Sequence, residues 1–435
     1  MKIALSSTSG IGAWFVLRLM AEGHEVDYYL SDQKYEDVLG GLIPKPKIVQ
    51  IDQRRHVQGY GFPSYKKYDM SLFDFTESTK WAEASKLDTP TFGDGEIENK
   101  LENDREFGLK FMEESGINVP PYTRFNNATE AKSFIKKEDK RYVYKPFTGG
   151  TASDDKAITY VSKSAEDLLG YIDVLWDRSH RAPFILQEFI KGTEVGTAGY
   201  FNGFDFYLLT GTLEEKKFMN DNKGPNTGCS GNLIYIMNHE MRIFREGLAK
   251  AKTALQQIGF KGIIDLNTIL TEDKMYGLEW TPRFGYFSDP IIATMYGSGF
   301  GEMLHSILTG KVPHIKWNHS FGVSTTISIP PYPTNIRLPN SKGIEIGGIE
   351  SEDIEDLCET YLYDVMLSKN KLVTSGNYGL IASPMVCGES YRETFEKLER
   401  RIEKIQIPDI QYRTDIDKST LKRYQFIIEN GWLNH

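Results

Sequence analysis

The sequence predicts a multidomain protein of mixed α/β and α+β class. Its 435 residues are too many for one hydrophobic core, so about two to four domains are expected. Residues 1–32 read as a strand, a small polar turn, a helix and a second strand, which is typical of the opening of a doubly wound α/β domain. Residues 119–190 combine short strands and helical segments around adjacent glycines, which indicates a small α+β unit.

The N-terminal α/β domain is expected to cover residues 1–100. A short apolar strand over residues 3–5 is followed by a helix with apolar residues at helical spacing and by a second strand over residues 26–30. Residues 6–12 join the first strand to the helix, and such a junction binds anions through free backbone N–H groups. Its glycine pattern is incomplete for a dinucleotide fold, so NAD binding has only weak support.

The middle of the chain, residues 101–321, is expected to form one domain that carries the 119–190 unit as a small subdomain. Its first element is a helix over residues 101–115 that ends at Gly116. Several strands follow, with one long helix around residues 241–258.

A C-terminal α+β domain is expected over residues 322–435. Pro330, Pro331 and Pro333 interrupt regular structure near its start. We expect the final helix at residues 391–405, with its charged face in solvent.

Composition excludes several classes of protein. The net charge is −9 and no long block of like charge is present, which argues against nucleic acid held on a broad basic surface. Three widely spaced cysteines form neither a disulfide framework nor a zinc pattern, so reduced thiols in a cytoplasm are the simplest interpretation. Neither a signal peptide nor a membrane-spanning run is expected. The eight histidines are scattered without the spacing of metal ligands.

Five short blocks, each weak alone, together predict an ATP site. They offer a lysine for phosphate, a glycine-rich flap, a backbone hinge for adenine, a rigid turn with exposed donors and an acidic strand for magnesium. Taken singly they could equally be a surface lysine beside a hairpin, an edge strand with a solvated glutamate, or a plain hairpin loop. The blocks are residues 144–146, 148–151, 187–190, 223–228 and 278–285.

Two acidic residues on successive strands are candidate metal ligands. Glu279 follows an acidic turn, and Asp265 lies on the strand before that turn. If the strands pair as a hairpin, both carboxylates can face one site, and hard oxygen ligands suit Mg²⁺. A carboxylate in an apolar strand is costly unless it is paired or metal-bound. Arg283 follows closely and offers a planar fork for a phosphate or a carboxylate.

These blocks resemble the ATP-grasp superfamily and, within it, the phosphoribosylamine–glycine ligase family. The most specific match is Lys216-Lys217 with Asp221 and residues 223–228. The resemblance covers almost the full chain through residues 101–117, 144–146, 188–194, 216–228, 283–285, 374–376 and 412–416.

The resemblance implies ATP with Mg²⁺ (or Mn²⁺) and a role for each matching residue. Catalytic roles fall on Arg283 and Lys145. Nucleotide contacts fall on Arg105, Lys145, Thr148, Gly149, Gly150, Gln187, Glu188, Phe189, Ile190, Glu194 and Lys216. Substrate contacts fall on Ser9, Gly10, Gly12, Asp221, Asn226, Thr227, Gly228, Arg283 and Gly285. Metal ligands are Glu279, Asp265 and Thr281.

The chain departs from the family pattern at four places. The first loop, residues 6–12, lacks the family's charged residues and histidine, and that loop helps to hold a phosphoribosyl substrate. Thr281 stands where the family has an asparagine metal ligand, for which Asp265 would compensate. Arg105 replaces a nucleotide lysine, which keeps the charge but changes its geometry. Residues 75–78 lack the expected Gly-Pro-Glu turn.

The resemblance leads to three hypotheses. The first is an ATP-dependent carboxylate–amine ligase that joins glycine to 5-phosphoribosylamine through an acyl phosphate. The second is the same chemistry on another amino acid or amine, which the altered first loop favours. The third is an inactive ATP-grasp binding protein. The expected partners are small molecules, without nucleic acid or membrane, and the expected state is a monomer or homodimer.

Overall fold

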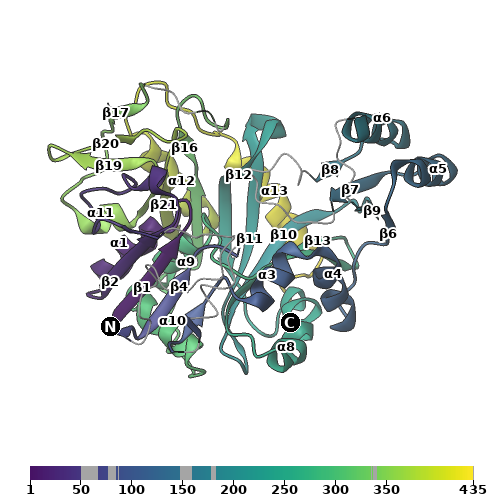
Figure 1. Ribbon diagram of the computed structural model, residues 1–435, viewed down its shortest axis with the longest axis horizontal. Helices are drawn as coiled ribbons and strands as arrows, with labels where there is room; N and C mark the ends of the chain where they lie inside the picture. Colours follow the sequence, from purple (N-terminus) through teal and green to yellow (C-terminus); the bar gives the residue numbers. More distant parts are fainter. Residues whose placement is uncertain are drawn as a thin grey trace.

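The computed structural model describes residues 1–49, 67–76, 85–86, 88–146, 159–177, 183–334, 336 and 340–434. Figure 1 shows an N-terminal sheet beside a large central sheet, with a smaller sheet projecting from the opposite side. The α/β and α+β multidomain class predicted from the sequence is confirmed. Among the described helices, none is long and apolar enough to cross a membrane.

The N-terminal sheet is parallel and has the order β3-β2-β1-β4-β5. The helix α1 (Ala13–Ala21) follows β1 and packs against the sheet. Because β1 and β4 are neighbours, with Ser6 opposite Phe73, the residues that follow both strands meet at the same edge. The strands are β1 (Lys2–Ser7), β2 (Glu25–Leu30), β3 (Lys47–Ile48), β4 (Met70–Phe73) and β5 (Thr91–Phe92).

The projecting unit is a four-stranded sheet of order β6-β9-β7-β8, covered by two helices (Figure 1). It has its own hydrophobic cluster, which includes Phe125, Tyr144 and Phe184. Its elements are β6 (Tyr122–Phe125), α5 (Ala128–Glu138), β7 (Tyr142–Pro146), β8 (Tyr160–Val161), α6 (Ala165–Asp177) and β9 (Phe184–Glu188).

The large sheet has the order β14-β13-β10-β11-β12-β15-β21-β16, and β18 also pairs with β21. The expected boundary between residues 321 and 322 falls inside β15, and the sheet continues across it. Pairing with β15 covers the edge of β12, which would otherwise expose unpaired backbone groups. The strands are β10 (Thr193–Phe201), β11 (Phe206–Met219), β12 (Lys223–Ile236), β13 (Gly262–Leu270), β14 (Met275–Thr281), β15 (Phe321–Thr325), β16 (Ile327–Ser328), β18 (Thr360–Leu362) and β21 (Leu380–Gly388).

The C-terminal part adds a three-stranded sheet of order β17-β20-β19. Helix α9 and helix α12 both pack against β15 and β21, whereas α13 packs against β10, β11 and β12. These elements are α9 (Asp289–Tyr296), α10 (Phe300–Leu308), β17 (Lys342–Glu345), α11 (Ile354–Cys358), β19 (Val365–Ser368), β20 (Lys371–Ser375), α12 (Tyr391–Ile402) and α13 (Ile416–Glu429).

Two helices expected to be continuous are broken. The helix expected over residues 101–115 is two helices, α3 (Glu96–Asn103) and α4 (Arg105–Glu114), because Asp104 is extended and its carboxylate caps α4 by accepting from the amide of Phe107. The helix expected around residues 241–258 is α7 (Arg242–Glu246) and α8 (Leu248–Gln257), separated by a non-helical Gly247.

The helix expected to be the last one is present as α12, but it is not the final helix. The expected helix at residues 391–405 ends at Ile402 and is followed by α13, which the sequence analysis missed. The buried face of α13 includes only Ile416, Thr420 and Ile427, so its apolar pattern is sparse.

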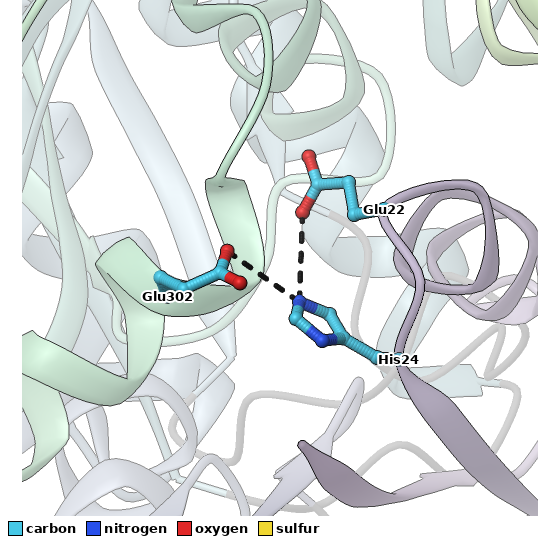
Figure 2. A group of neighbouring side chains, drawn as sticks. All are labelled: Glu22, His24 and Glu302. Atoms are coloured by element: carbon cyan, nitrogen blue, oxygen red, sulfur yellow. Dashed lines mark ion pairs between the residues drawn. The ribbon is translucent and has the colours of Figure 1, made fainter.

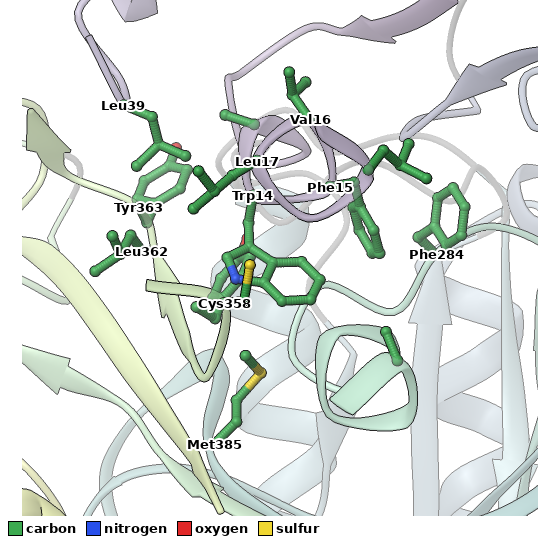
Figure 3. Close-up of a cluster of buried hydrophobic side chains, with 14 of the residues drawn as sticks. Trp14, Phe15, Val16, Leu17, Leu39, Phe284, Cys358, Leu362, Tyr363 and Met385 are labelled. Atoms are coloured by element: carbon green, nitrogen blue, oxygen red, sulfur yellow. The ribbon is translucent and has the colours of Figure 1, made fainter. Parts of the chain in front are cut away.

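A single hydrophobic cluster joins the N-terminal domain to the C-terminal part. Figure 3 shows Trp14 and Phe15 of α1 among side chains from distant segments, including Phe284, Tyr363 and Met385. The Phe15 and Phe284 rings lie 4.5 Å apart, and both residues are almost fully buried. This packing fixes the loop after β1 relative to the large sheet.

Replacing Phe284 with alanine should lower the free energy of unfolding by about 3–5 kcal/mol, because the ring is fully buried against Phe15 and Phe92. The control is Phe204→Ala, whose side chain is 65% exposed and should cost less than about 0.5 kcal/mol. Urea denaturation of both variants measures the difference. Equal losses of unfolding free energy in the two variants would contradict a hydrophobic core shared by the N-terminal and C-terminal parts.

Candidate functional site

A cavity of about 750 Å³ lies where the N-terminal sheet, the large sheet and the C-terminal part meet. It combines residues from the loop after β1, the β13–β14 hairpin and the turn that follows β14. The residues proposed from the sequence that line it are Ser9, Arg105, Glu194, Lys216, Gly228, Asp265, Glu279, Thr281, Arg283 and Gly285.

The predicted hairpin between the two acidic strands is confirmed. Asp265 pairs with Thr281, and Asn267 pairs with Glu279. Directly opposed residues of antiparallel strands share a face, as do residues two apart on one strand. All four side chains therefore lie on the face that lines the cavity.

The oxygen donors of this hairpin suit a hard divalent cation. Burial and the nearby Glu214 raise the pKa of Asp265 to about 7, as expected for a carboxyl that lacks a counter-charge of its own. Desolvation would also raise the pKa of Glu279, but Lys216 and the other cations around it lower that pKa. Two carboxylates and a hydroxyl on one face fit Mg²⁺, and Asn267 adds an amide that the sequence analysis did not consider.

Lys216 and Glu194 form an ion pair at the same end of the cavity. The Lys216 Nζ atom lies 2.6 Å from Glu194 Oε1, which also accepts from Asn267 Nδ2 at 3.0 Å. Burial works against the charge of Glu194, but Lys216, Asn267 and Arg423 outweigh it and lower its pKa to about 2. Glu194 is therefore a fixed anion beside the proposed metal face.

Lys145 lies on β7 of the projecting sheet and is buried. Burial and the positive charge of Arg105 lower the pKa of Lys145 to about 8. Arg105 lines the cavity and donates from Nε to the carbonyl of Pro146 at 2.9 Å. Its side chain therefore contacts the end of β7, the strand that carries Lys145. Lys145 itself is not among the residues that line the cavity.

The proposed adenine hinge, residues 187–190, also lies outside the residues that line the cavity. Gln187 is buried, and Glu188 pairs with Lys140 at 3.1 Å. The amides of Glu188 and Phe189 already donate to protein carbonyls. Among the described residues, the amide of Ile190 donates to no backbone carbonyl outside the helices and strands.

Arg283 is held in place by Glu102, a residue to which the sequence analysis gave no role. Its Nε atom donates to Glu102 Oε1 at 2.9 Å, and Glu102 Oε2 accepts from Thr76 at 2.8 Å. Burial opposes the charge of Arg283, yet Glu102 and nearby groups raise its pKa further. The arginine therefore stays cationic at one wall of the cavity, facing Tyr286 at 4.5 Å from the ring centroid.

The loop after β1, which contains Ser9, Gly10 and Gly12, is closed by an internal carboxylate. Asp74 follows β4, and its Oδ2 atom accepts from Gly12 N at 2.7 Å and from the Ser7 hydroxyl at 2.6 Å. Burial raises the pKa of Asp74 to about 7, although the Ser7 and Gly12 hydrogen bonds oppose that rise. Of the three residues proposed from the sequence, only Ser9 lines the cavity.

The proposed substrate turn is the tip of a long β-hairpin between β11 and β12. Asp221 and Asn226 are exposed there and do not line the cavity, whereas Gly228 does. Asp221 donates through its amide to Asp415, and the Thr227 hydroxyl donates to the carbonyl of Lys216. The substrate contact proposed for Asp221 and Asn226 therefore stays a prediction. Thr148, Gly149, Gly150, Glu77 and Ser78 lie outside the described residues.

A second acidic group lies away from the cavity. Figure 2 shows His24 between Glu22 and Glu302, with Nε2 at 3.9 and 3.5 Å from their carboxylates. Glu22 already accepts from the amides of Phe300 and Gly301 and pairs with Arg18. The group therefore acts as a cap that ties the N-terminal domain to the first turn of α10.

Several groups that shape the cavity escaped sequence reasoning. Asp74 comes directly after a buried strand, and Asn267 lies two residues from Asp265, so alternation along the strands could have found both. The tyrosines that line the cavity come from distant segments and carry no local signal. They are Tyr35, Tyr286, Tyr332, Tyr363 and Tyr378.

Known proteins resemble this chain in sequence and in fold. Residues 103–290 match the family of the phosphoribosylglycinamide synthetase ATP-grasp (A) domain. A phosphoribosylamine–glycine ligase of Clostridium acetobutylicum is 26% identical over 339 residues, 75% of this chain and 78% of the relative. One from Thermotoga maritima is 25% identical over 333 residues, 73% of this chain and 77% of the relative.

Solved structures share the fold at low identity. The phosphoribosylamine–glycine ligase of Thermotoga maritima superposes with a TM-score of 0.72 at 19% identity, covering 95% of this chain and 100% of the other. The biotin carboxylase domain of Hydrogenobacter thermophilus 2-oxoglutarate carboxylase, solved with MgADP, has a TM-score of 0.64 at 13% identity and covers 100% of this chain and 98% of the other.

The fold and the matched segment define an ATP-grasp enzyme, a class that in general uses ATP with Mg²⁺. Residues 103–290 belong to the phosphoribosylglycinamide synthetase ATP-grasp (A) domain family, and about three quarters of the chain is similar to phosphoribosylamine–glycine ligases. The protein is an ADP-forming carbon–nitrogen ligase.

Nucleotide affinity should fall as pH rises through about 8. Lys145 is cationic below its pKa of about 8 and neutral above it, so the lysine attracts phosphate only at the lower pH. The affinity for MgATP should weaken by ~10-fold between about pH 7 and pH 9. Lys145→Arg stays charged throughout and should remove most of this dependence. Parallel profiles for the two proteins in calorimetric titrations would contradict the role given to Lys145.

Proposed function

We propose that this enzyme forms an amide by activating a carboxylate with ATP and passing the acyl phosphate to an amine. The observation that carries the proposal is one continuous cavity. The oxygen donors of the β13–β14 hairpin, Lys216 and Arg283 share its walls with the loop after β1. Phosphoryl transfer and amine attack can therefore follow one another without release of the intermediate.

The side chains of the cavity fit the charges of this reaction. Arg283, held by Glu102, would neutralise the charge that develops on the transferred phosphoryl group and on the acyl phosphate. Lys145, on the projecting sheet, would bind phosphate oxygens when that sheet approaches the nucleotide. A Mg²⁺ ion held by Glu279, Asp265 and Thr281 would supply Lewis-acid stabilisation of the phosphates.

In the second step the amine lone pair attacks the acyl carbon. A carbon–nitrogen bond forms, the carbon–oxygen bond to phosphate breaks, and inorganic phosphate leaves with the electron pair. The proton lost by the amine passes to the departing phosphate. Holding the acyl phosphate between the walls of the cavity would limit its hydrolysis.

Glycine and 5-phosphoribosylamine are the first candidate substrates. The names of the relatives favour this pair, because curated proteins matched over three quarters of this chain are phosphoribosylamine–glycine ligases. If the product is glycinamide ribonucleotide, the enzyme acts in purine biosynthesis.

A different amine is the second candidate, and one observation favours it. Asp74 accepts from the Gly12 amide and the Ser7 hydroxyl of the loop after β1, and it thereby takes one of the backbone donors that an anionic group of the acceptor would use. The ATP chemistry and the choice of amine are thus separable, and the first test must not depend on the amine.

Hydroxylamine supplies that test, because it traps an acyl phosphate as a hydroxamate whatever the natural amine is. The full-length protein with ATP, Mg²⁺, hydroxylamine and glycine, or another amino acid in turn, should release ADP and hydroxamate in equal amounts. Glu279→Gln should lower both rates by at least about 100-fold, since the metal would lose a carboxylate ligand.

The matched control is Glu272→Gln, an exposed residue in the turn of the same hairpin, which should keep full activity. Hydroxamate formation that survives in Glu279→Gln would contradict the metal assignment. Absence of hydroxamate with every amino acid would contradict the ligase proposal.

A further inference from the structure

We infer that the C-terminal helix α13 completes the nucleotide site, and that its Arg423 is a positioning residue that holds Glu194 for the ribose of ATP. The inference deepens the proposed function, because it concerns how the nucleotide that activates the carboxylate is held. Arg423, Glu194 and Lys216 all line the cavity, although Arg423 lies 229 residues from Glu194 in the chain.

The position of Arg423 on α13 directs its side chain toward the large sheet. The helix packs against β10, β11 and β12. Its buried residues are Ile416, Thr420 and Ile427. Arg423 follows Thr420 by three positions and precedes Ile427 by four, so it lies on the same face of the helix. The face that anchors α13 to the sheet therefore also carries a cation to the strands.

Arg423 bridges β10 and β11 at the point where these strands part. In this described part of the chain, their pairing ends at Gly196 and Thr212. Two residues farther along, Nη2 of Arg423 donates to the carbonyl of Glu194 at 2.8 Å and Nη1 donates to the carbonyl of Glu214 at 3.0 Å. One planar guanidinium thus satisfies a carbonyl on each strand beyond the end of the ladder.

The guanidinium is itself held by Glu215, whose side chain is only 3% exposed. Glu215 Oε1 accepts from Arg423 Nη1 at 2.8 Å and from the Ser419 hydroxyl at 2.6 Å. The other oxygen of Glu215 accepts from Arg413 at 3.3 Å. Because a buried carboxylate is costly without its counter-charges, this acid keeps Arg423 in place. Charge therefore ties α13 to β11 in addition to apolar packing.

Glu194, whose backbone Arg423 fixes, has one carboxylate oxygen left for a ligand. Lys216 and Asn267 both donate to Oε1, and Oε2 accepts from no residue in the described part of the chain. A carboxylate repels phosphates, so it can bind a nucleotide only through the ribose hydroxyls or the adenine amino group. The amino group is expected at the proposed hinge, residues 187–190. The ribose hydroxyls are therefore the donors for Glu194.

The test compares ATP with 2′,3′-dideoxy-ATP, which lacks both ribose hydroxyls but keeps the adenine and the phosphates. Calorimetric titration of the full-length protein with each nucleotide and Mg²⁺ gives the ratio of the two dissociation constants. The unaltered protein should bind ATP at least about 10-fold more tightly than the dideoxy analogue. Arg423→Gln should weaken ATP by about 10-fold and the analogue by less than about 2-fold, so the ratio should fall by at least about 5-fold.

Three further variants separate the role of Arg423 from a general structural one. Lys422→Gln removes the neighbouring exposed cation of α13 and should leave the ratio unchanged. Glu194→Gln should lower the ratio, and adding Arg423→Gln to it should lower the ratio no further, since both act through one carboxylate. Arg423→Lys keeps the charge, but an ammonium lacks the planar fork, so its ratio should stay at least about 3-fold below that of the unaltered protein.

Four results would overturn the inference. Equal weakening of ATP and its dideoxy analogue in Arg423→Gln would contradict a role through the ribose and would leave the ligase proposal standing. An additional fall of the ratio in the double variant would contradict action through Glu194. A full recovery in Arg423→Lys would contradict the bridge between the strands. No binding of MgATP to the unaltered protein would remove this inference and the ligase proposal together.

Urea denaturation shows whether Arg423→Gln is folded. In that variant Glu215 keeps Arg413 and Ser419 as partners, so a cooperative transition is expected. If the variant does not fold, the ratio measured in Arg423→Lys decides the outcome.

Discussion

The register of the β13–β14 hairpin is the constraint on which the candidate site depends. Because side chains alternate along a strand, a shift of one residue would turn both carboxylates away from the cavity. The observed pairing of Asp265 with Thr281 and of Asn267 with Glu279 instead gathers their oxygen donors on one face. The repulsion between these acids is offset by Lys216 and Arg105, which approach from β11 and α4. The hairpin thus creates a place where bound cations and phosphates are stabilised.

The loop after β1 depends on packing between distant parts of the chain. The cluster around Trp14 holds α1 against the C-terminal strands (Figure 3). Tyr361 and Tyr363 of that part donate to the carbonyls of Ile11 and Ser9. The loop after β1 is therefore a rigid wall shared by the N-terminal and C-terminal parts. Asp74 contributes to this rigidity, since its carboxylate closes the loop by accepting from the amide of Gly12.

Local patterns predicted the β1–α1–β2 opening, the acidic hairpin and the general fold class, because each depends on neighbours in sequence. They failed where tertiary contacts decide. Asp104 and Gly247 break helices that apolar spacing alone would continue. The ion pair of Arg283 with Glu102 joins residues far apart in the chain, and no spacing rule reveals it. Asp221 and Asn226 carried a motif, yet the structure places them at an exposed hairpin tip.

The central claim is that ATP phosphorylates a carboxylate before the amine attacks. The most direct measurement supplies the carboxylate substrate labelled with ¹⁸O in both oxygens and analyses the inorganic phosphate by mass spectrometry. Transfer through an acyl phosphate predicts one ¹⁸O atom in each phosphate released, because the bridging oxygen leaves with phosphorus when the carbon–nitrogen bond forms. Phosphate that carries no ¹⁸O, released together with an amide product, would contradict the account.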